Sequence, residues 1–317
     1  MMVPEALPFE QDIHELERLL EKSEASGAHG NDEYKLIRRE LNALLKQKYA
    51  NLTAWETVLV SRHPKRPQFL DYVDLCFDEF TELHGDRTYG DDRAIRCGFG
   101  RIGEHKIMLV GHQKGRTLRE RQQCFYGCAH PEGYRKALRT MKLAAKYRVP
   151  IVCLIDTPGA YPGIGAEERG QSQLIATSIL EMSRLGTPIV CVVIGEGGSG
   201  GALGIGVGDR VSMMQYAYYS VISPEGCAGI LWKTATDETK PKAATALRLT
   251  SAALLKNGIV DDVISEPLGG AHRSPKDAAT SLRGYVQRQL IELSALNTRS
   301  LLDSRYVKFR KMGHFSQ

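Results

Sequence analysis

The stretch of this sequence with the clearest chemical potential is a cluster of glycines, GEGGSGGALGIG, at residues 195–206. It follows an apolar run at residues 189–194, which is typical of a buried strand, and it appears where a helix is expected to begin. Glycine lets backbone N–H groups approach a ligand without obstruction by side chains. The amino end of a helix adds a partial positive charge. The cluster therefore predicts a place where backbone N–H groups hold an oxyanion or a phosphate.

Two nucleotide-binding motifs fit this cluster only in part. Residues 195–200 satisfy G-x-G-x-x-G, but residues 216–223 lack the acidic residue that a dinucleotide fold places about 20 residues further on. A P-loop requires lysine and then serine or threonine where this sequence has Gly201 and Ala202. The dinucleotide interpretation is thus weakly supported, and the P-loop interpretation is rejected.

Two other interpretations of the cluster stay open. Residues 197–201 fit the G-x-S-x-G nucleophile elbow of serine hydrolases, and Asp261 and His272 follow in the hydrolase order. Alternatively, Ser199 is only a small residue in a tight turn, and the loop works through its backbone N–H groups. Such groups stabilise a developing enolate-type oxygen in acyl-CoA enzymes of the crotonase type.

A basic cluster offers a second place for chemistry. It consists of Lys114, Arg116, Arg119 and Arg121. These side chains are suited to phosphates or to a carboxylate, although runs of charge are usually solvated surface.

Buried strands that alternate with helices must position these residues. Apolar runs at residues 107–110, 151–155 and 189–194 predict strands. Residues 133–147, after Pro131, and residues 167–185 predict the intervening helices. Strand, helix and strand in this succession predict an α/β layer structure with nearly parallel strands.

The remainder of the chain is mostly helical in its pattern. Leucine and isoleucine recur at helical spacing on both sides of a break at residues 26–30, which predicts an antiparallel helical hairpin. Residues 220–223 and 259–264 predict strands, and residues 239–256 predict a helix that ends at a glycine cap. A long helix with a polar tail is expected from residue 275 onward.

Composition excludes several classes of protein. The chain has 317 residues and a net charge of only +5, which is too weak and diffuse to indicate nucleic-acid binding. It has no apolar run of about 20 residues, so we expect no membrane span, and its start has no pattern of a secretory signal. The seven cysteines are odd in number and scattered, which favours reduced thiols in a cytoplasmic protein. Cys124, Cys128 and His130 lie close together, but paired Cys-x-x-Cys motifs are lacking, so we expect no metal site.

Several long motifs, in one order, resemble the alpha subunits of the bacterial and plastid multi-subunit acetyl-CoA carboxylase carboxyltransferase. These motifs are GHQKGR (111–116), PEGYRKAL (131–138), IDTPGAYPG (155–163), GAEERGQ (165–171), GEGGSGG (195–201), VISPEGC (221–227) and EPLGGAH (266–272). The resemblance runs from about residue 9 to about residue 310. Cys128 and His130 depart from the family pattern, which leaves the details of their loop open.

The resemblance implies an α/β, crotonase-like (ClpP-like) fold of repeated ββα units with an N-terminal helical arm. On this basis we expect a hairpin arm at residues 1–65, a carboxyltransferase domain at residues 66–290, and a C-terminal helix and tail at residues 291–317.

The resemblance also implies an activity and a set of partners. The family transfers a carboxyl group from carboxybiotin to acetyl-CoA, which forms malonyl-CoA in fatty acid biosynthesis. Biotin is carried by the biotin carboxyl carrier protein and not by this chain, and biotin carboxylase is the component that uses ATP. A beta subunit of the same core fold completes an α2β2 heterotetramer and carries the zinc. We expect a cytoplasmic enzyme with no membrane or nucleic-acid partner.

The implied chemistry assigns roles to particular residues. Charge develops on the ureido oxygen of biotin and on the thioester enolate, so the reaction needs two oxyanion holes. We expect Gly200 and Gly201 to hold the ureido oxygen, and a valine at position 201 to abolish transfer with the fold intact. The pocket lining is expected to consist of Gly197, Gly198, Ala160, Tyr161 and Gly163. Lys114 and Arg116 are the expected contacts to CoA or to a carboxylate.

Overall fold

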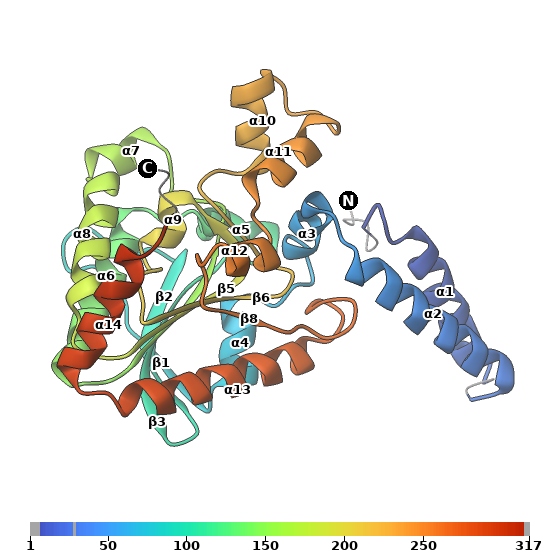
Figure 1. The fold of residues 1–317 in the computed structure, drawn as a ribbon, viewed down its shortest axis with the longest axis horizontal. Coiled ribbons are helices and arrows are strands. Elements are labelled where there is room, and N and C mark those ends of the chain that lie inside the picture. The colour runs from blue at the N-terminus through green and yellow to red at the C-terminus, as the bar shows by residue number, and fades with distance from the viewer. Residues whose placement is uncertain (1–6, 28–29, 314–317) are drawn as a thin grey trace.

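A computed structural model of the chain describes residues 7–27 and 30–313 and shows an α/β molecule built on one sheet of eight strands (Figure 1). The sheet has the order β1-β2-β3-β4-β5-β6-β8, and β7 pairs with the end of β5. The strands are β1 (Glu79–Glu82), β2 (Ile95–Ile102), β3 (His105–His112), β4 (Ile151–Thr157), β5 (Ile189–Gly198), β6 (Arg210–Met214), β7 (Tyr218–Ser220) and β8 (Asp262–Ile264). The first three strands pair antiparallel, and all later pairs are parallel.

The three central strands predicted from apolar runs are confirmed as parts of β3, β4 and β5. Every residue of β4 and β5 is buried, as expected for parallel strands that are covered on both faces. Strand β5 is longer than predicted, because it continues through Gly198 and includes the first four residues of the glycine cluster. A third of the glycine cluster is therefore strand, and the turn begins after Gly198.

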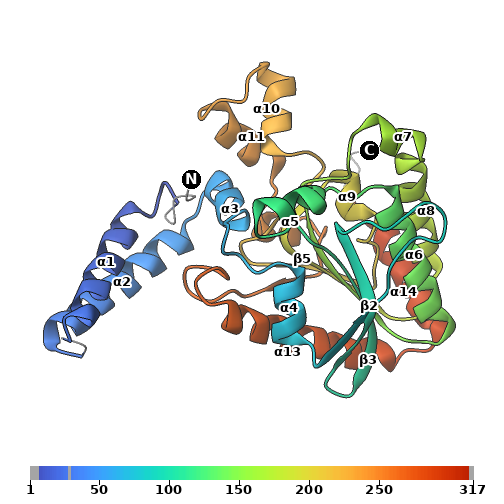
Figure 2. The same cartoon turned by 180° about the vertical axis from the view of Figure 1, so that it is seen from behind.

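Helices cover both sides of the sheet. They are α1 (Gln11–Ala25), α2 (Asp32–Ala50), α3 (Ala54–Ser61), α4 (Phe69–Cys76), α5 (Leu118–Gln123), the 3-10 helix η1 (Phe125–Gly127), α6 (Pro131–Lys146), α7 (Ile164–Glu168), α8 (Gln171–Arg184), α9 (Ser199–Leu203), α10 (Pro224–Trp232), α11 (Thr239–Leu247), α12 (Ser251–Lys256), α13 (Pro275–Ser294) and α14 (Thr298–Arg310). Figures 1 and 2 show α6, α8 and α14 stacked on one side and α4 with α13 on the other.

Two predicted helices are each divided in two by a left-handed residue. The helix expected at residues 167–185 is interrupted at Gly170, where φ is +81°, so that α7 and α8 are separate. The acidic residues Glu167 and Glu168 consequently belong to the short α7 and do not open the long helix. The helix expected at residues 239–256 is divided in the same way at Arg248, where φ is +50°.

The remaining boundary differences are smaller. The strand expected at residues 220–223 lies earlier, as β7, because Ser223 instead caps α10 by accepting a hydrogen bond from the Gly226 N–H. Only the last three residues of the strand expected at 259–264 form β8. The long C-terminal helix is confirmed as α13, but a second helix, α14, forms where a polar tail was expected.

The predicted N-terminal hairpin is confirmed as α1 and α2, which pack against each other and project from the body (Figures 1 and 2). Part of the predicted break, residues 28–29, lies outside the described residues, as do the ends of the first and last expected domains, residues 1–6 and 314–317. Glu10, at the base of the arm, is buried and accepts hydrogen bonds from the Tyr49 hydroxyl and from Arg273, both at 2.7 Å. The division into three domains stays a prediction.

Helix α14 is fixed to the body by Arg305, whose side chain is 1% exposed. Its guanidinium forms two hydrogen bonds with the Asp209 carboxylate, at 2.8 and 2.7 Å. It also donates to the carbonyl oxygens of Met182, Leu185 and Thr187. Two of these carbonyls belong to the end of α8, where the last carbonyls lack partners within the helix.

No helix among the described residues is long and apolar enough to cross a membrane.

Candidate oxyanion site and its charged support

The glycine cluster joins β5 to the short helix α9, which begins at Ser199. Ser199 adopts a left-handed conformation with φ of +51°, and this turns the chain sharply from strand to helix. The N–H groups in the first turn of a helix have no acceptor within that helix. The N–H groups of Gly200 and Gly201 fall in this turn, so they are available to an oxygen atom from outside.

Close packing explains why two of these positions are glycine. A Cβ atom at Gly201 would lie 2.5 Å from the backbone nitrogen of Ala160, and one at Gly198 would lie 2.1 Å from the carbonyl oxygen of Pro158. The turn after β5 thus fits directly against the turn after β4. A valine at position 201 would disturb this contact, so the expectation that it leaves the fold intact is wrong.

Gly200 differs from its neighbours because it has room for a side chain. The nearest atom to a Cβ at this position is the Cδ1 of Ile175 at 3.5 Å, which is an ordinary contact distance. Gly200 lies in the wall of a pocket of about 410 Å³ beside α9. The other lining residues are mainly apolar: Ser199, Leu203, Tyr219, Ser220, Val221, Leu247, Leu254 and Ile259.

The other residues predicted to line this pocket lie near it but not in its wall. Gly197 and Gly198 are buried in β5, and Ala160 lies against Gly201. The Tyr161 ring covers Gly163, where a Cβ would lie 2.4 Å from the ring. Their contact with a ligand stays a prediction, and in the structure their glycines serve close packing.

Tyr161 stacks on His130, one of the two residues that depart from the family pattern. The rings of Tyr161 and His130 are 4.0 Å apart and nearly parallel, and Phe125 meets both rings edge-on. His130 therefore supports the turn after β4.

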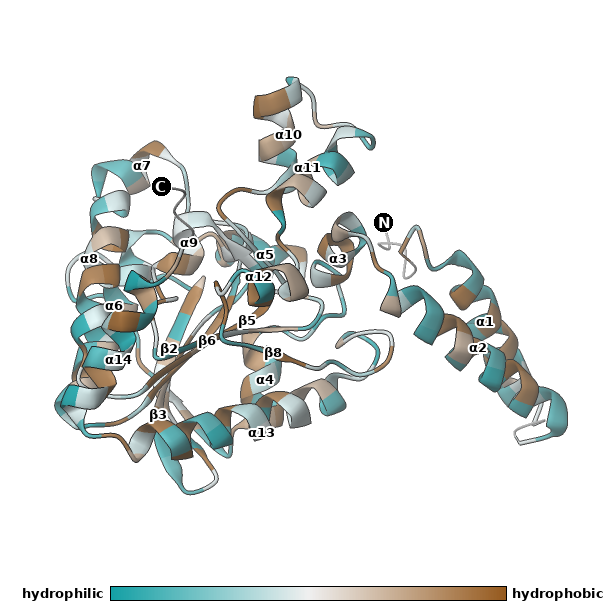
Figure 3. Ribbon diagram, in the orientation of Figure 1, coloured by the Kyte–Doolittle hydropathy of each residue, from teal (hydrophilic) through white to brown (hydrophobic). Residues whose placement is uncertain are grey.

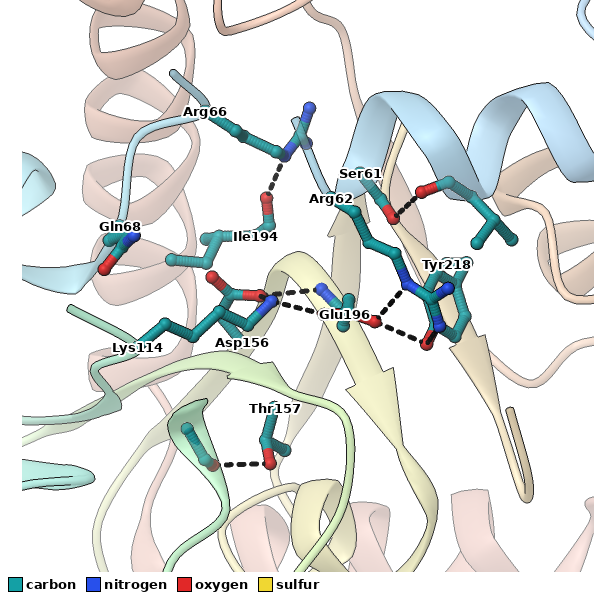
Figure 4. Close-up of polar contacts among 12 residues, drawn as sticks. Ser61, Arg62, Arg66, Gln68, Lys114, Asp156, Thr157, Ile194, Glu196 and Tyr218 are labelled. Carbon is teal, nitrogen blue, oxygen red and sulfur yellow. Dashed lines mark hydrogen bonds and ion pairs between the residues drawn. The ribbon is translucent and has the colours of Figure 1, made fainter. Parts of the chain in front are cut away.

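A cluster of charged residues holds the carboxyl ends of β4 and β5 together (Figure 4). Asp156 and Glu196 follow the apolar runs of these strands, and the Lys114 ammonium lies 2.6 Å from both carboxylates. Asp156 also accepts a hydrogen bond from the Glu196 N–H at 2.8 Å. Arg62, at the end of α3, contacts Glu196 at 2.6 Å and Glu225 at 2.5 Å. The cluster therefore connects five segments of the chain.

The cluster is completed by neighbouring polar contacts. The Tyr218 hydroxyl donates to Glu196 at 2.8 Å. Arg66 pairs with the buried Glu266 and donates to the carbonyl of Ile194 in β5.

Glu196 and Lys114 keep their charges at neutral pH. Burial alone would raise the pKa of Glu196, but Lys114 and Arg62 lower it to about 2. Burial alone would lower the pKa of Lys114, but Asp156 and Glu196 raise it above its ordinary value. A carboxylate with so low a pKa is a poor general base at pH 7. The cluster is therefore suited to fix the strand ends and not to transfer protons.

The ion pairs of Lys114 and Arg116 change the interpretation of the predicted basic cluster. Lys114 is paired with two carboxylates, and Arg116 is paired with Asp71 and donates to the Pro64 carbonyl. Both cations are thus engaged in ion pairs, whereas the sequence suggested that they are free to contact a ligand. The Arg121 side chain, in contrast, makes no hydrogen bond or ion pair with any residue that the structure describes. Arg121 and Tyr126 line a second pocket, of about 320 Å³, whose wall includes Lys114 and Glu196.

The geometry does not support the serine hydrolase interpretation. Asp261 accepts hydrogen bonds from the Val211 N–H and from Lys308, and not from a histidine. The two ring nitrogens of His272 have no hydrogen-bond partner within the described part of the chain. His272 instead stacks on His63, with ring centroids 4.0 Å apart. Ser199 thus lacks the hydrogen-bonded base that would activate it.

Two kinds of residue escaped the sequence analysis. Asp156 and Glu196 carry a recognisable signal, because each is an acid close behind a buried apolar run. Arg62 carries no such signal, since it lies 134 positions before Glu196 and reaches it only through the fold. Within the described residues, no group of three or more His, Cys, Asp or Glu side chains is placed to hold a metal ion.

Comparison with known proteins leads to the same family as the sequence motifs. The family model described as acetyl co-enzyme A carboxylase carboxyltransferase-like matches residues 6–313. A relative from Rhodopirellula baltica, named acetyl-coenzyme A carboxylase carboxyl transferase subunit alpha, is 57% identical over 99% of both chains. Relatives with the same name from Methylococcus capsulatus and Escherichia coli are 50% and 49% identical, over 98% and 97% of this chain and 98% of theirs.

Solved structures support the fold. Transcarboxylase 12S superposes with a TM-score of 0.55 at 20% identity, over 70% of this chain and 43% of that one. The beta subunit of geranyl-CoA carboxylase from P. aeruginosa gives 0.55 at 19% identity, over 76% and 45%. This chain spans less than half of either structure, and likeness at this identity concerns the fold alone. The expected crotonase-like fold is confirmed.

The charged cluster predicts that Lys114→Met destabilises the protein by about 3–5 kcal/mol at pH 7, because two buried carboxylates lose their shared cation. The pKa of Glu196 lies below its ordinary 4.5, so its stabilising contribution is complete above pH 4.5 and is lost as the pH falls toward 2. The deficit of the variant should therefore stay constant from pH 7 down to about pH 5 and shrink as the pH falls from 4.5 toward 2. Urea denaturation at pH 7, pH 4.5 and pH 3 measures this.

Lys142→Met serves as the matched control. Lys142 pairs with Glu181 at 2.8 Å on the surface, with a half-exposed side chain, so its loss should cost less than about 1 kcal/mol. Equal effects of the two substitutions at pH 7 would show that the Lys114 cluster does not stabilise the fold.

Proposed function

The chain belongs to the family of acetyl-CoA carboxylase carboxyltransferase alpha subunits, and we propose that it transfers a carboxyl group from carboxybiotin to acetyl-CoA, together with a beta subunit. The product is malonyl-CoA, for fatty acid biosynthesis. One observation supports the site assignment: Gly200, in the first turn of α9, lines an apolar pocket of about 410 Å³, and Gly201 follows it in the same turn.

The reaction defines what the site must stabilise. The bond between the ureido nitrogen and the carboxyl carbon breaks, which releases CO2 and leaves negative charge on the ureido oxygen. The freed ureido nitrogen takes a proton from the acetyl methyl group, and the resulting enolate carbon forms a new bond to CO2. Two oxygens carry charge in this sequence, and each needs hydrogen-bond donors aimed at it.

We assign the ureido oxygen to the Gly200 and Gly201 N–H groups. The aliphatic and aromatic wall formed by Leu203, Tyr219 and Leu254 suits the apolar faces of the biotin rings. Among the described residues Ser199 has no hydrogen-bonded base, and the carboxylates of Asp156 and Glu196 are paired with cations. Backbone N–H groups are therefore the donors best suited to stabilise the oxyanion. The enolate oxygen is then held by the equivalent donors of the beta subunit.

An exposed apolar surface beside this pocket supports contact with the beta subunit. Val221 is 79% exposed, and Ile230 and Leu231 on α10 are more than 60% exposed. Figure 3 shows this hydrophobic stretch of α10 on a projection above the sheet. Contiguous exposed apolar residues mark sites of protein association. A partner seated there would close the open side of the pocket, as an α2β2 assembly requires.

The remaining components are assigned to other chains. We infer that biotin arrives on the biotin carboxyl carrier protein after biotin carboxylase has used ATP, and that zinc belongs to the beta subunit. The scattered cysteines favour a cytoplasmic enzyme. Arg121, and not Lys114 or Arg116, is the cation best placed to meet a phosphate of CoA.

Activity of mixtures tests the shared site. In the reverse reaction, malonyl-CoA carboxylates free biotin, and acetyl-CoA formation is measured for this chain, for its beta partner and for the two together. We expect turnover only in the mixture. Turnover by this chain alone would contradict the shared site, and no turnover in the mixture would contradict the activity.

Gly200→Ala tests the oxyanion hole. The added methyl group has space in the protein, but it stands beside the two N–H groups and keeps an oxygen atom away. We expect kcat of the mixture to fall on the order of 10²-fold, as for loss of an oxyanion donor, with an unchanged melting temperature. Gly284→Ala is the control, because Gly284 lies exposed on α13 with no atom near a Cβ. Normal turnover by Gly200→Ala would remove Gly200 from the site.

Arg121→Ala tests the phosphate contact. We expect KM for malonyl-CoA to rise about tenfold, as for loss of one charge-assisted hydrogen bond, with little change in kcat. Arg119→Ala is the matched control, because Arg119 lies exposed on the same helix and outside the pocket. A malonyl-pantetheine substrate, which has no nucleotide phosphates, should remove the difference between the variants. The same rise in KM with this substrate would exclude a phosphate contact.

A further inference from the structure

The carbonyl group of Gly201 has an unusual partner. Helix α9 ends after five residues, and the backbone N–H groups that follow it go elsewhere: that of Gly204 to Gly200 and that of Ile205 to Ala202. The buried Gly201 carbonyl is thus left without an N–H donor from its own helix. The Tyr134 hydroxyl, on α6, donates to this oxygen at a distance of 3.2 Å.

Tyr134 is held rigidly where it makes this contact. Its side chain is fully buried. The ring lies directly against Gly204, where a Cβ would be only 2.5 Å from Cε1. On another side it meets the ring of His112, at the end of β3, in an edge-on contact of 6.5 Å. Burial raises the pKa of Tyr134, so the hydroxyl keeps its proton and remains a donor.

This contact bears on the direction of the oxyanion donors. The turn is fixed on one side, because Gly201 lies under Gly159 and Ala160. The opposite end of the same residue, its carbonyl group, is fixed by Tyr134. The Gly201 carbonyl belongs to the planar peptide unit between Gly201 and Ala202, and this unit meets the unit that carries the Gly201 N–H at the Gly201 Cα atom. The two contacts hold the backbone on either side of this Cα atom, so the direction of the Gly201 N–H depends on both of them.

We infer that Tyr134 is a positioning residue for carboxyl transfer, which aims the N–H group of Gly201 through its hydrogen bond to the Gly201 carbonyl. It touches no reacting atom. The inference rests on the proposed function, since it assigns no role to Tyr134 if this turn does not bind an oxyanion.

Tyr134→Phe, assayed as the complex with the beta subunit, tests the inference. The substitution removes one oxygen atom and keeps the ring against Gly204. We expect kcat to fall about tenfold, less than for loss of a donor itself, because the donors remain but are misaimed. KM for malonyl-CoA should change less than about twofold, because ground-state binding is unaffected.

A spectroscopic measurement separates positioning from stability. Hydrogen bonds lower the stretching frequency of a carbonyl group, so isotope-labelled biotin bound to the complex reports the aim of the donors. We expect the ureido carbonyl frequency to move toward its value in free solution in Tyr134→Phe. A variant that only loosens the fold would leave this frequency unchanged.

Tyr285→Phe is the matched control. The Tyr285 hydroxyl is also buried, and it bonds to Ser212 and to Asp262, on strands β6 and β8. Its loss should lower the melting temperature without changing kcat or the carbonyl frequency. If Tyr134→Phe behaves in the same way, the inference is overturned. If Gly200→Ala is inactive while Tyr134→Phe is normal, this inference fails alone, whereas normal turnover in both variants removes the proposed site as well.

Discussion

Two carboxylates that are buried side by side place the strictest demand on this molecule. Asp156 and Glu196 end neighbouring parallel strands, and their mutual repulsion in a dry interior has to be offset by cations. Lys114 lies between them, and Arg62 reaches Glu196 from the N-terminal part of the chain. Segments 134 positions apart are thus tied to one point. The turns that follow β4 and β5 start from this point, so their relative position is set before any ligand arrives.

Glycine then determines how closely those two turns approach. Carbonyl and amide groups of residues 158–160 occupy the space that side chains at positions 198 and 201 would need. The sequence motif therefore serves two purposes that are easily confused. Gly198 and Gly201 are required by backbone packing, whereas Gly200 faces the pocket and tolerates a Cβ sterically. Of these three positions, only Gly200 can be substituted to test the chemistry without also disturbing the fold.

The strongest sequence signals were those that depend on local physics. Apolar runs located β3, β4 and β5, and helical spacing located the hairpin arm, because burial imposes these patterns directly. Interruptions at Gly170 and Arg248 were missed, since a single left-handed residue within a helical pattern leaves little trace. The family motifs led to proposed roles for the turn, but they gave no indication of the pairing of Lys114. Its partners lie 42 and 82 positions further along the chain, and only the sheet order brings them together.

The anchoring of α14 has a consequence for biosynthesis. Arg305 lies on α14, yet it provides the partners for three buried carbonyls and for Asp209, which are made far earlier in the chain. Those groups are synthesised more than 90 residues earlier, so they gain these partners only after α14 has been made. The corner formed by α8 and β6 therefore depends on a segment that is distant in the chain. Without Arg305, the buried Asp209 carboxylate would lack the guanidinium that compensates its charge.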